Sequence, residues 1–215
     1  MNTSGGEADV LRVLRALAPR RNSSFLESLH IAELQAEQFL ELLDITGPPV
    51  PRRVVAEIPN IEVRLDNALP ASGSAHWEAG CWVITLKRSE SLSRRRFSLM
   101  HELKHVLDHP IKHHLYGDTI ADPIAAYRAE RGADQFAACV LMPERWIKRE
   151  WFIGGERLAD VAARFGVSPR ALSVRLWLLG MAPQVKRWAT MPPQVTDGQD
   201  PARYFRPMAD LEIAL

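Results

Sequence analysis

Three things are scarce in this sequence: cysteine, net charge and long apolar runs. Only two cysteines, Cys81 and Cys139, occur among 215 residues, which excludes a scaffold held together by disulfides. Lys and Arg number 27 against 26 Asp and Glu, so the net charge of +1 gives no general attraction to nucleic acid. No apolar run approaches the ~20 residues that span a bilayer, and the N-terminal residues lack the apolar segment of a signal peptide. A cytoplasmic protein without a membrane partner is therefore predicted.

The most informative stretch that is present is Arg94–His109, with the sequence RRRFSLMHELKHVLDH. Its apolar residues recur at spacings of three and four, which predicts an amphipathic helix. On such a helix His101 and His105 lie one turn apart on the same face, so both imidazoles can bind one ion. Glu102 lies beside them and can take a proton from a metal-bound water whose pKa the ion lowers towards ~7. The pattern predicts a zinc hydrolase site with Glu102 as its catalytic base.

A third metal ligand would distinguish such a site from a chance match to this short pattern. The HExxHxxGxxH arrangement is excluded, because Asp108 and Ile111 stand where it needs glycine and histidine. Residues 124–142 predict a second helix, on which Glu130 and Asp134 are one turn apart. Glu130 can complete a His-His-Glu site, and Asp134 can accept a hydrogen bond from a ligand imidazole. The alternative for Glu130 is a solvated carboxylate paired with a neighbouring arginine.

Together, the two predicted helices resemble the ImmA/IrrE family of metallopeptidases. The shared patterns are F-[ST]-x-x-HE-x-x-H and E-x-x-A-[ND]-x-F-A-A-x-x-L-M-P, and the likeness covers roughly residues 32–181. Many relatives carry a second acidic residue where this chain has Gly132, which leaves Glu130 as the local carboxylate for the metal. The matching residues in this chain are Arg96, Phe97, Ser98, His101, Glu102 and His105, then Glu130, Ala133, Asp134, Phe136, Ala137, Ala138, Leu141, Met142 and Pro143.

The resemblance implies a fold, a cofactor and a substrate class. The fold would be α+β and zincin-like, with a small twisted sheet and active-site helices. The cofactor would be Zn²⁺, although Mn²⁺ or Fe²⁺ would suit the same donors. The substrate would be a helix-turn-helix repressor, often encoded nearby, whose cleavage relieves the repression of stress or mobile-element genes. The competing hypothesis is a non-catalytic, metal-binding transcriptional regulator that acts through DNA or protein binding. Glu102 argues against it, because a structural zinc site has no use for this carboxylate.

A small sheet is predicted between residues 51 and 87. Val54–Ala56, Ile61–Leu65 and Cys81–Leu86 are short β-branched or aromatic runs bounded by Pro, Asn and Gly. The last run is placed as the strand beside the metal helix. If it lies at an exposed edge, its backbone can hold an extended peptide substrate, and the residues concerned are Trp82, Val83 and Ile84. An ordinary edge strand without a substrate role is the alternative.

A group that stabilises the oxyanion is commonly needed in such hydrolases. The donors near the metal helix in the sequence are Tyr116, His113 and His114, and the sequence does not choose among them.

Beyond residue 147 the pattern changes to two short helices joined by a tight turn, which predicts a helix-turn-helix-like segment. Its surplus of basic residues allows phosphate contacts, but its second helix offers no Asn or Gln for reading bases. Packing or protein recognition is therefore favoured over DNA binding. The predicted organisation is a flexible segment with a short helix at 1–22, a zinc metallopeptidase domain at 23–147, the helix-turn-helix-like segment at 148–182 and a Pro-rich tail at 183–215.

Overall fold

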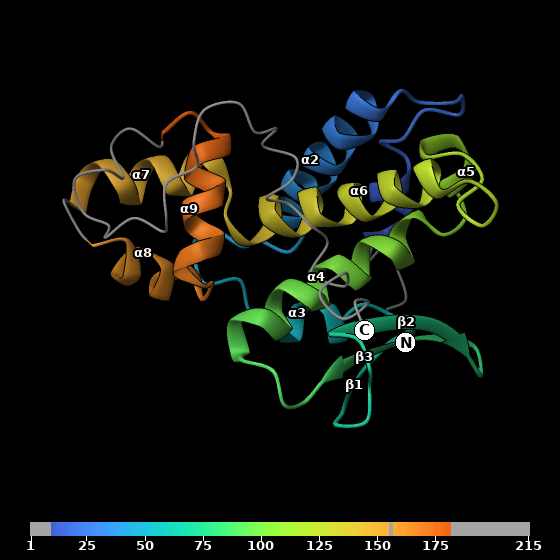
Figure 1. Ribbon diagram of the computed structural model, residues 1–215, viewed down its shortest axis with the longest axis horizontal. Helices are drawn as coiled ribbons and strands as arrows, with labels where there is room; N and C mark the ends of the chain where they lie inside the picture. The colour runs from blue at the N-terminus through green and yellow to red at the C-terminus, as the bar shows by residue number, and fades with distance from the viewer. Residues whose placement is uncertain (1–9, 155–156, 182–215) are drawn as a thin grey trace, which may run out of the picture.

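A computed structural model describes residues 10–154 and 157–181 of the chain (Figure 1). Its architecture is α+β, as predicted, and the Pro-rich segment 183–215 lies outside the described residues. The strands are β1 (Ile61–Asp66), β2 (Gly73–Glu78) and β3 (Cys81–Lys87). The helices are α1 (Val10–Arg15), α2 (Phe25–Leu42), α3 (Arg53–Ala56), α4 (Leu92–Asp108), α5 (Lys112–Leu115), α6 (Pro123–Leu141), α7 (Glu144–Gly154), α8 (Leu158–Phe165) and α9 (Pro169–Leu178).

The sheet has the strand order β1-β3-β2, with β1 parallel and β2 antiparallel to β3. Trp82 on β3 is in register with Ile61 on one side and with Trp77 on the other. The prediction that Trp82, Val83 and Ile84 form an exposed edge is therefore wrong, because both sides of β3 are already paired. β2 packs against α4 and is an edge strand of this sheet, and within residues 10–154 and 157–181 no other strand pairs with its second side.

One predicted strand is a helix. Residues 54–56 lie in α3, where Val54 and Val55 are both buried and Arg53 is exposed. Consecutive residues of a strand point to opposite faces, whereas one helical turn can direct two adjacent valines into the same core. Burial of both side chains therefore overrides their β propensity.

The helices form a layer over the sheet, with α4 between the sheet and α6 (Figure 1). α2 packs along α6, and the rings of Phe39 and Phe136 meet edge to face at 6.1 Å. A capping box is present at the start of α2, with Ser24 and Glu27 each bonding to the other's backbone N–H. None of the helices among the described residues is long and apolar enough to cross a membrane.

α7, α8 and α9 gather at one end of α6 (Figure 1). α8 ends at Gly166, whose φ of 65° is in the left-handed region that favours glycine, and Ser168 caps α9. Phe165 and Leu172 share one core with the side chains of α4 and α6. Buried Arg175 also donates from Nε to the carbonyl of Met142, at 3.2 Å. The hydrophobic core therefore runs without a break across the predicted boundary at residue 148.

Candidate metal centre

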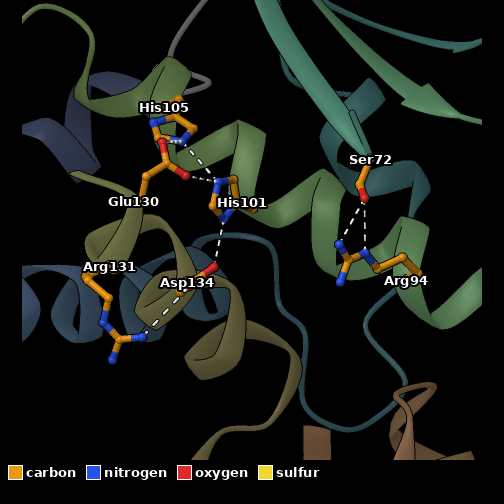
Figure 2. Close-up of polar contacts among 7 residues, drawn as sticks. All are labelled: Ser72, Arg94, His101, His105, Glu130, Arg131 and Asp134. Carbon is orange, nitrogen blue, oxygen red and sulfur yellow. Dashed lines mark hydrogen bonds and ion pairs between the residues drawn. The ribbon is translucent and has the colours of Figure 1, made fainter. Parts of the chain in front are cut away.

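Three predicted ligands meet where α4 faces α6 (Figure 2). His101 and His105 project from consecutive turns of α4, and Glu130 reaches them from α6. The two Nε2 atoms are 3.1 Å apart. The carboxylate of Glu130 lies 3.2 Å from Nε2 of His101 and 3.3 Å from Nε2 of His105. Glu130 follows His101 by 29 residues and His105 by 25 in the sequence. The packing of α4 against α6 is what brings its carboxylate to the two imidazoles.

These separations fit a small divalent cation. Zinc bonds of about 2.0–2.1 Å in tetrahedral geometry place neighbouring donors about 3.3–3.4 Å apart. The three observed separations, 3.1, 3.2 and 3.3 Å, approximate one face of such a tetrahedron. His101, His105 and Glu130 would hold the ion and leave its fourth position for water or substrate.

Asp134 orients one of the imidazoles from one turn further along α6. Its Oδ1 is 3.0 Å from Nδ1 of His101, and its side chain is buried. A proton on Nδ1 is donated to this carboxylate, which leaves Nε2 as the lone-pair nitrogen towards Glu130. Arg131 lies 3.9 Å from the other oxygen of Asp134 (Figure 2). The arrangement agrees with the predicted supporting role of Asp134.

The electrostatics of the site favour positive charge between these groups. Burial alone lowers the pKa of His101, but its hydrogen bonds to Asp134 and Glu130 outweigh burial and raise that pKa to about 10. Burial raises the pKa of Glu130, yet the two imidazoles outweigh it and hold that pKa well below its usual range. Protons on the imidazoles satisfy the carboxylates here, and a divalent cation can take their place.

Glu102 lies in the same cavity but is not one of the three converging ligands. Burial is the main reason that its pKa is raised above the usual range of a glutamate. β2 approaches this carboxylate so closely that a Cβ at Gly73 would lie 2.9 Å from Cγ and Oε1 of Glu102. A glycine at the start of β2 therefore leaves room for Glu102 between the strand and the ligands.

The cavity over the metal ligands has a volume of about 390 Å³. Its far wall comes from Arg94, two turns before His101 on α4, and from Ser72, just before β2. Arg94 donates from Nε and Nη2 to Oγ of Ser72, at 3.2 and 2.9 Å (Figure 2). Its Nε also lies 3.2 Å from Oε2 of Glu90. Sequence reasoning missed this contact between strand and helix, because nothing local pairs a serine with an arginine 22 residues later.

The structure gives little support to the three predicted oxyanion donors. The hydroxyl of Tyr116 donates to Oδ2 of Asp108 at 2.6 Å, so its proton is already committed. The rings of His113 and His114 are tilted by 43° with centroids 3.8 Å apart, and neither residue lines this cavity or a second one that shares His105 and Glu130 with it. Tyr116 is engaged with Asp108 and neither histidine lines a cavity at the ligands, so none of the three is placed as an oxyanion donor.

Comparisons with known proteins agree with this geometry. Residues 56–177, more than half of the chain, match the peptidase family described as the IrrE N-terminal-like domain. No curated protein matches the chain. A solved Mycobacterium tuberculosis transcriptional regulator has a similar fold, with a TM-score of 0.56 and 16% sequence identity; the match covers 86% of this chain and 53% of that one. The chain thus spans about half the length of that protein, and at this identity the likeness concerns the fold alone. On the match over residues 56–177, the chain belongs to the IrrE N-terminal-like peptidase family and has its zincin-like fold.

Proposed function

We propose that this protein is a zinc-dependent endopeptidase that cuts one peptide bond in a specific regulatory protein. The observation that carries the proposal is the placement of Glu102, a half-buried carboxylate with a raised pKa, in one cavity with the converging ligands His101, His105 and Glu130. Among the residues that the structure describes, three ligand atoms converge without a fourth protein donor, which leaves the open position that a catalytic site needs. A helix-turn-helix repressor is the proposed substrate, in line with the family resemblance.

The chain's own residues account for the proton transfers. When bound, the cation supplies a water of lowered pKa and polarises the scissile carbonyl. Glu102 accepts the proton of that water on its carboxylate and then donates it to the leaving amine. The raised pKa of Glu102 suits both steps, because a general acid and base works best when its pKa is near the working pH. Asp134 keeps the ring of His101 in the tautomer that presents Nε2.

The unpaired side of β2 is the proposed backbone partner of the substrate. Gly73 and Ala75 of this strand line the cavity over the ligands, and Gly73 approaches Glu102 directly. An extended peptide added to this edge would run along α4 and pass the ligands. β2 thus replaces β3 as the strand proposed to hold the substrate.

The proposal is tested by incubating the zinc-loaded protein with a helix-turn-helix repressor encoded beside it and following the repressor by intact mass. Wild type is expected to produce a single cut, and Glu102→Gln is expected to cut about 10²–10⁴-fold more slowly while still binding zinc. Glu144→Gln, the same change at an exposed position of α7, is the control and should cut normally. If wild type and control both bind zinc and the repressor but cut nothing, the non-catalytic regulator is supported instead.

A further inference from the structure

A second cavity opens on the other side of the metal ligands. It has a volume of about 260 Å³ and shares His105 and Glu130 with the cavity described above. Its outer wall comes from the end of α4 and from α5, where His109 and Lys112 lie. Because the two cavities meet at the ligands, a substrate lying across the metal would place one of its side chains in the second cavity.

The two acidic residues that line this cavity, Asp108 and Glu130, already have partners for their carboxylates. Asp108 receives hydrogen bonds from buried Lys104 at 2.7 Å and from Tyr116 at 2.6 Å. Glu130 faces the two imidazoles and, in the proposed function, the cation. Neither carboxylate is therefore left to repel an anionic group of a substrate.

Lys112 supplies the positive charge that remains. It is the first residue of α5 and is half-buried in the wall of the cavity. Among the residues that the structure describes, no hydrogen bond or ion pair holds its ammonium. The charge of Lys112 contributes, as the smallest of its causes, to the lowered pKa of Asp118. That carboxylate, however, accepts hydrogen bonds from the backbone N–H groups of Ile120 and Ala121 and does not line the cavity.

His109, in the wall of this cavity, is linked to two tryptophans of the sheet. The ring of His109 lies 4.9 Å from that of Trp82, and Trp82 meets Trp77 edge to face at 5.6 Å. Trp77 is 58% exposed, which is unusual for a tryptophan on a strand that runs beside the metal centre. The carbon stem of a substrate side chain would lie against the ring of His109 in the cavity wall and bring its polar end to Lys112.

We propose that this cavity is a specificity subsite for an acidic side chain, aspartate or glutamate, of the substrate near the scissile bond, with Lys112 as its ionic partner and His109 as a neighbouring donor. The inference rests on the proposed peptidase function and adds the chemistry by which the enzyme selects its substrate. A carboxylate partly shielded from water gains a charge-assisted hydrogen bond from the ammonium that a neutral amide of the same size does not.

Binding of inhibitors tests the subsite without requiring turnover. Two short peptide hydroxamates, identical except for glutamate or glutamine next to the metal-binding group, are titrated calorimetrically into the zinc-loaded protein. Wild type is expected to bind the glutamate compound about tenfold more tightly. Lys112→Met is expected to remove this preference and Lys112→Glu to reverse it. Lys148→Glu, the same charge reversal at an exposed position of α7, should retain it. Circular dichroism of each variant shows that the fold is intact.

Cleavage of a proteome-derived peptide library then separates the two proposals. If peptides are cut without an acidic preference and the two hydroxamates bind equally, the subsite is overturned and the peptidase stands. If no peptide is cut but the glutamate preference holds and depends on Lys112, the subsite is supported and the peptidase proposal fails. Failure of both hydroxamates to bind the zinc-loaded protein would overturn the subsite at this metal centre.

Discussion

α4 carries two sets of polar side chains, and they differ in what their neighbours provide. His101 and His105 face the cavity and meet Glu130, a carboxylate that both of them approach from the same side. Lys104 and Asp108 project from an adjacent, buried side of the same helix, and Asp108 also lines the second cavity. The comparison shows how one helix can be a structural element and also carry a candidate metal site.

The buried side is complete without a ligand. Lys104 is 1% exposed, and its ammonium bonds to Asp108 and, at 2.6 Å, to Oε1 of Gln35 on α2. Gln35 in turn donates to the carbonyl of Leu14 at 3.1 Å, and Tyr116 donates to Asp108. Each strong donor meets an acceptor, so this network joins α1, α2 and α4 and needs nothing from solution.

The metal side is satisfied only by positive charge, which either protons on the imidazoles or a bound cation can supply. The donor atoms of His101, His105 and Glu130 converge on one volume, and without that charge their lone pairs repel one another. Complementary partners make a polar cluster structural, whereas converging donors of the same kind make it a binding site. Variants on the two sides should therefore fail in different ways.

The largest expected effect on stability is on the buried side. Asp108→Ala leaves the ammonium of Lys104 in surroundings whose burial already lowers its pKa, so the free energy of unfolding should fall by about 3–5 kcal/mol. Urea denaturation measures it. Glu144 and Lys148 form an exposed pair with the same spacing on α7, and Glu144→Ala should cost less than about 1 kcal/mol.

A double variant sharpens this first prediction. Lys104→Met combined with Asp108→Ala removes both charges, and part of the lost stability should return. If Asp108→Ala costs no more than Glu144→Ala, the buried network is not the stabilising element described above.

On the metal side, stability should instead depend on the ion. Zinc at about one hundred times its dissociation constant should raise the free energy of unfolding by about 2.7 kcal/mol over chelated protein. Glu130→Gln should lose most of that gain at the same free zinc concentration. Denaturation curves with and without a chelator make the measurement, and identical midpoints for wild type would mean that the three ligands do not hold a metal.

Asp134→Ala should lower the zinc affinity of the site, although it removes none of the three proposed ligands. Loss of the hydrogen bond to His101 is expected to reduce zinc affinity about 10–100-fold, as measured by competition with a chromogenic chelator. Asp160→Ala, at an exposed position of α8, is the control and should bind zinc as wild type does. An unchanged affinity in Asp134→Ala would leave this aspartate without a role in the centre.

The same contrast explains how far sequence alone could go. The convergence of His101, His105 and Glu130 was predictable because helical spacing places such side chains on defined faces, and the helices themselves follow from apolar periodicity. Lys104 was not, because a lysine within a charged helix is usually solvated. Lys104 and Asp108 are four residues apart, and each directly follows a buried leucine, Leu103 or Leu107. This spacing is the signal that could have indicated a buried pair.

Structural features that depend on contacts between distant segments of the chain could not be predicted from the sequence. The central position of β3 depends on β1 and β2 pairing on both of its sides, which the sequence of β3 cannot encode. The helical α3 depends on the core that buries Val54 and Val55. The contact between Arg94 and Ser72 likewise exists only after β2 has packed on α4.

The smallest expected effect on stability concerns Gly132 on α6, which faces Tyr116, the residue that donates to Asp108 of α4. A Cβ at Gly132 would be 2.3 Å from the hydroxyl oxygen of Tyr116, whose buried ring has little room to move. Gly132→Ala gains about 1 kcal/mol of helix propensity, but overpacking costs about 1–3 kcal/mol, so a net loss of about 1 kcal/mol is expected in urea denaturation. Tyr116→Phe removes the clashing oxygen, and Gly132→Ala should cost less in that background. If it costs the same in both backgrounds, the absence of a side chain at position 132 is not explained by Tyr116.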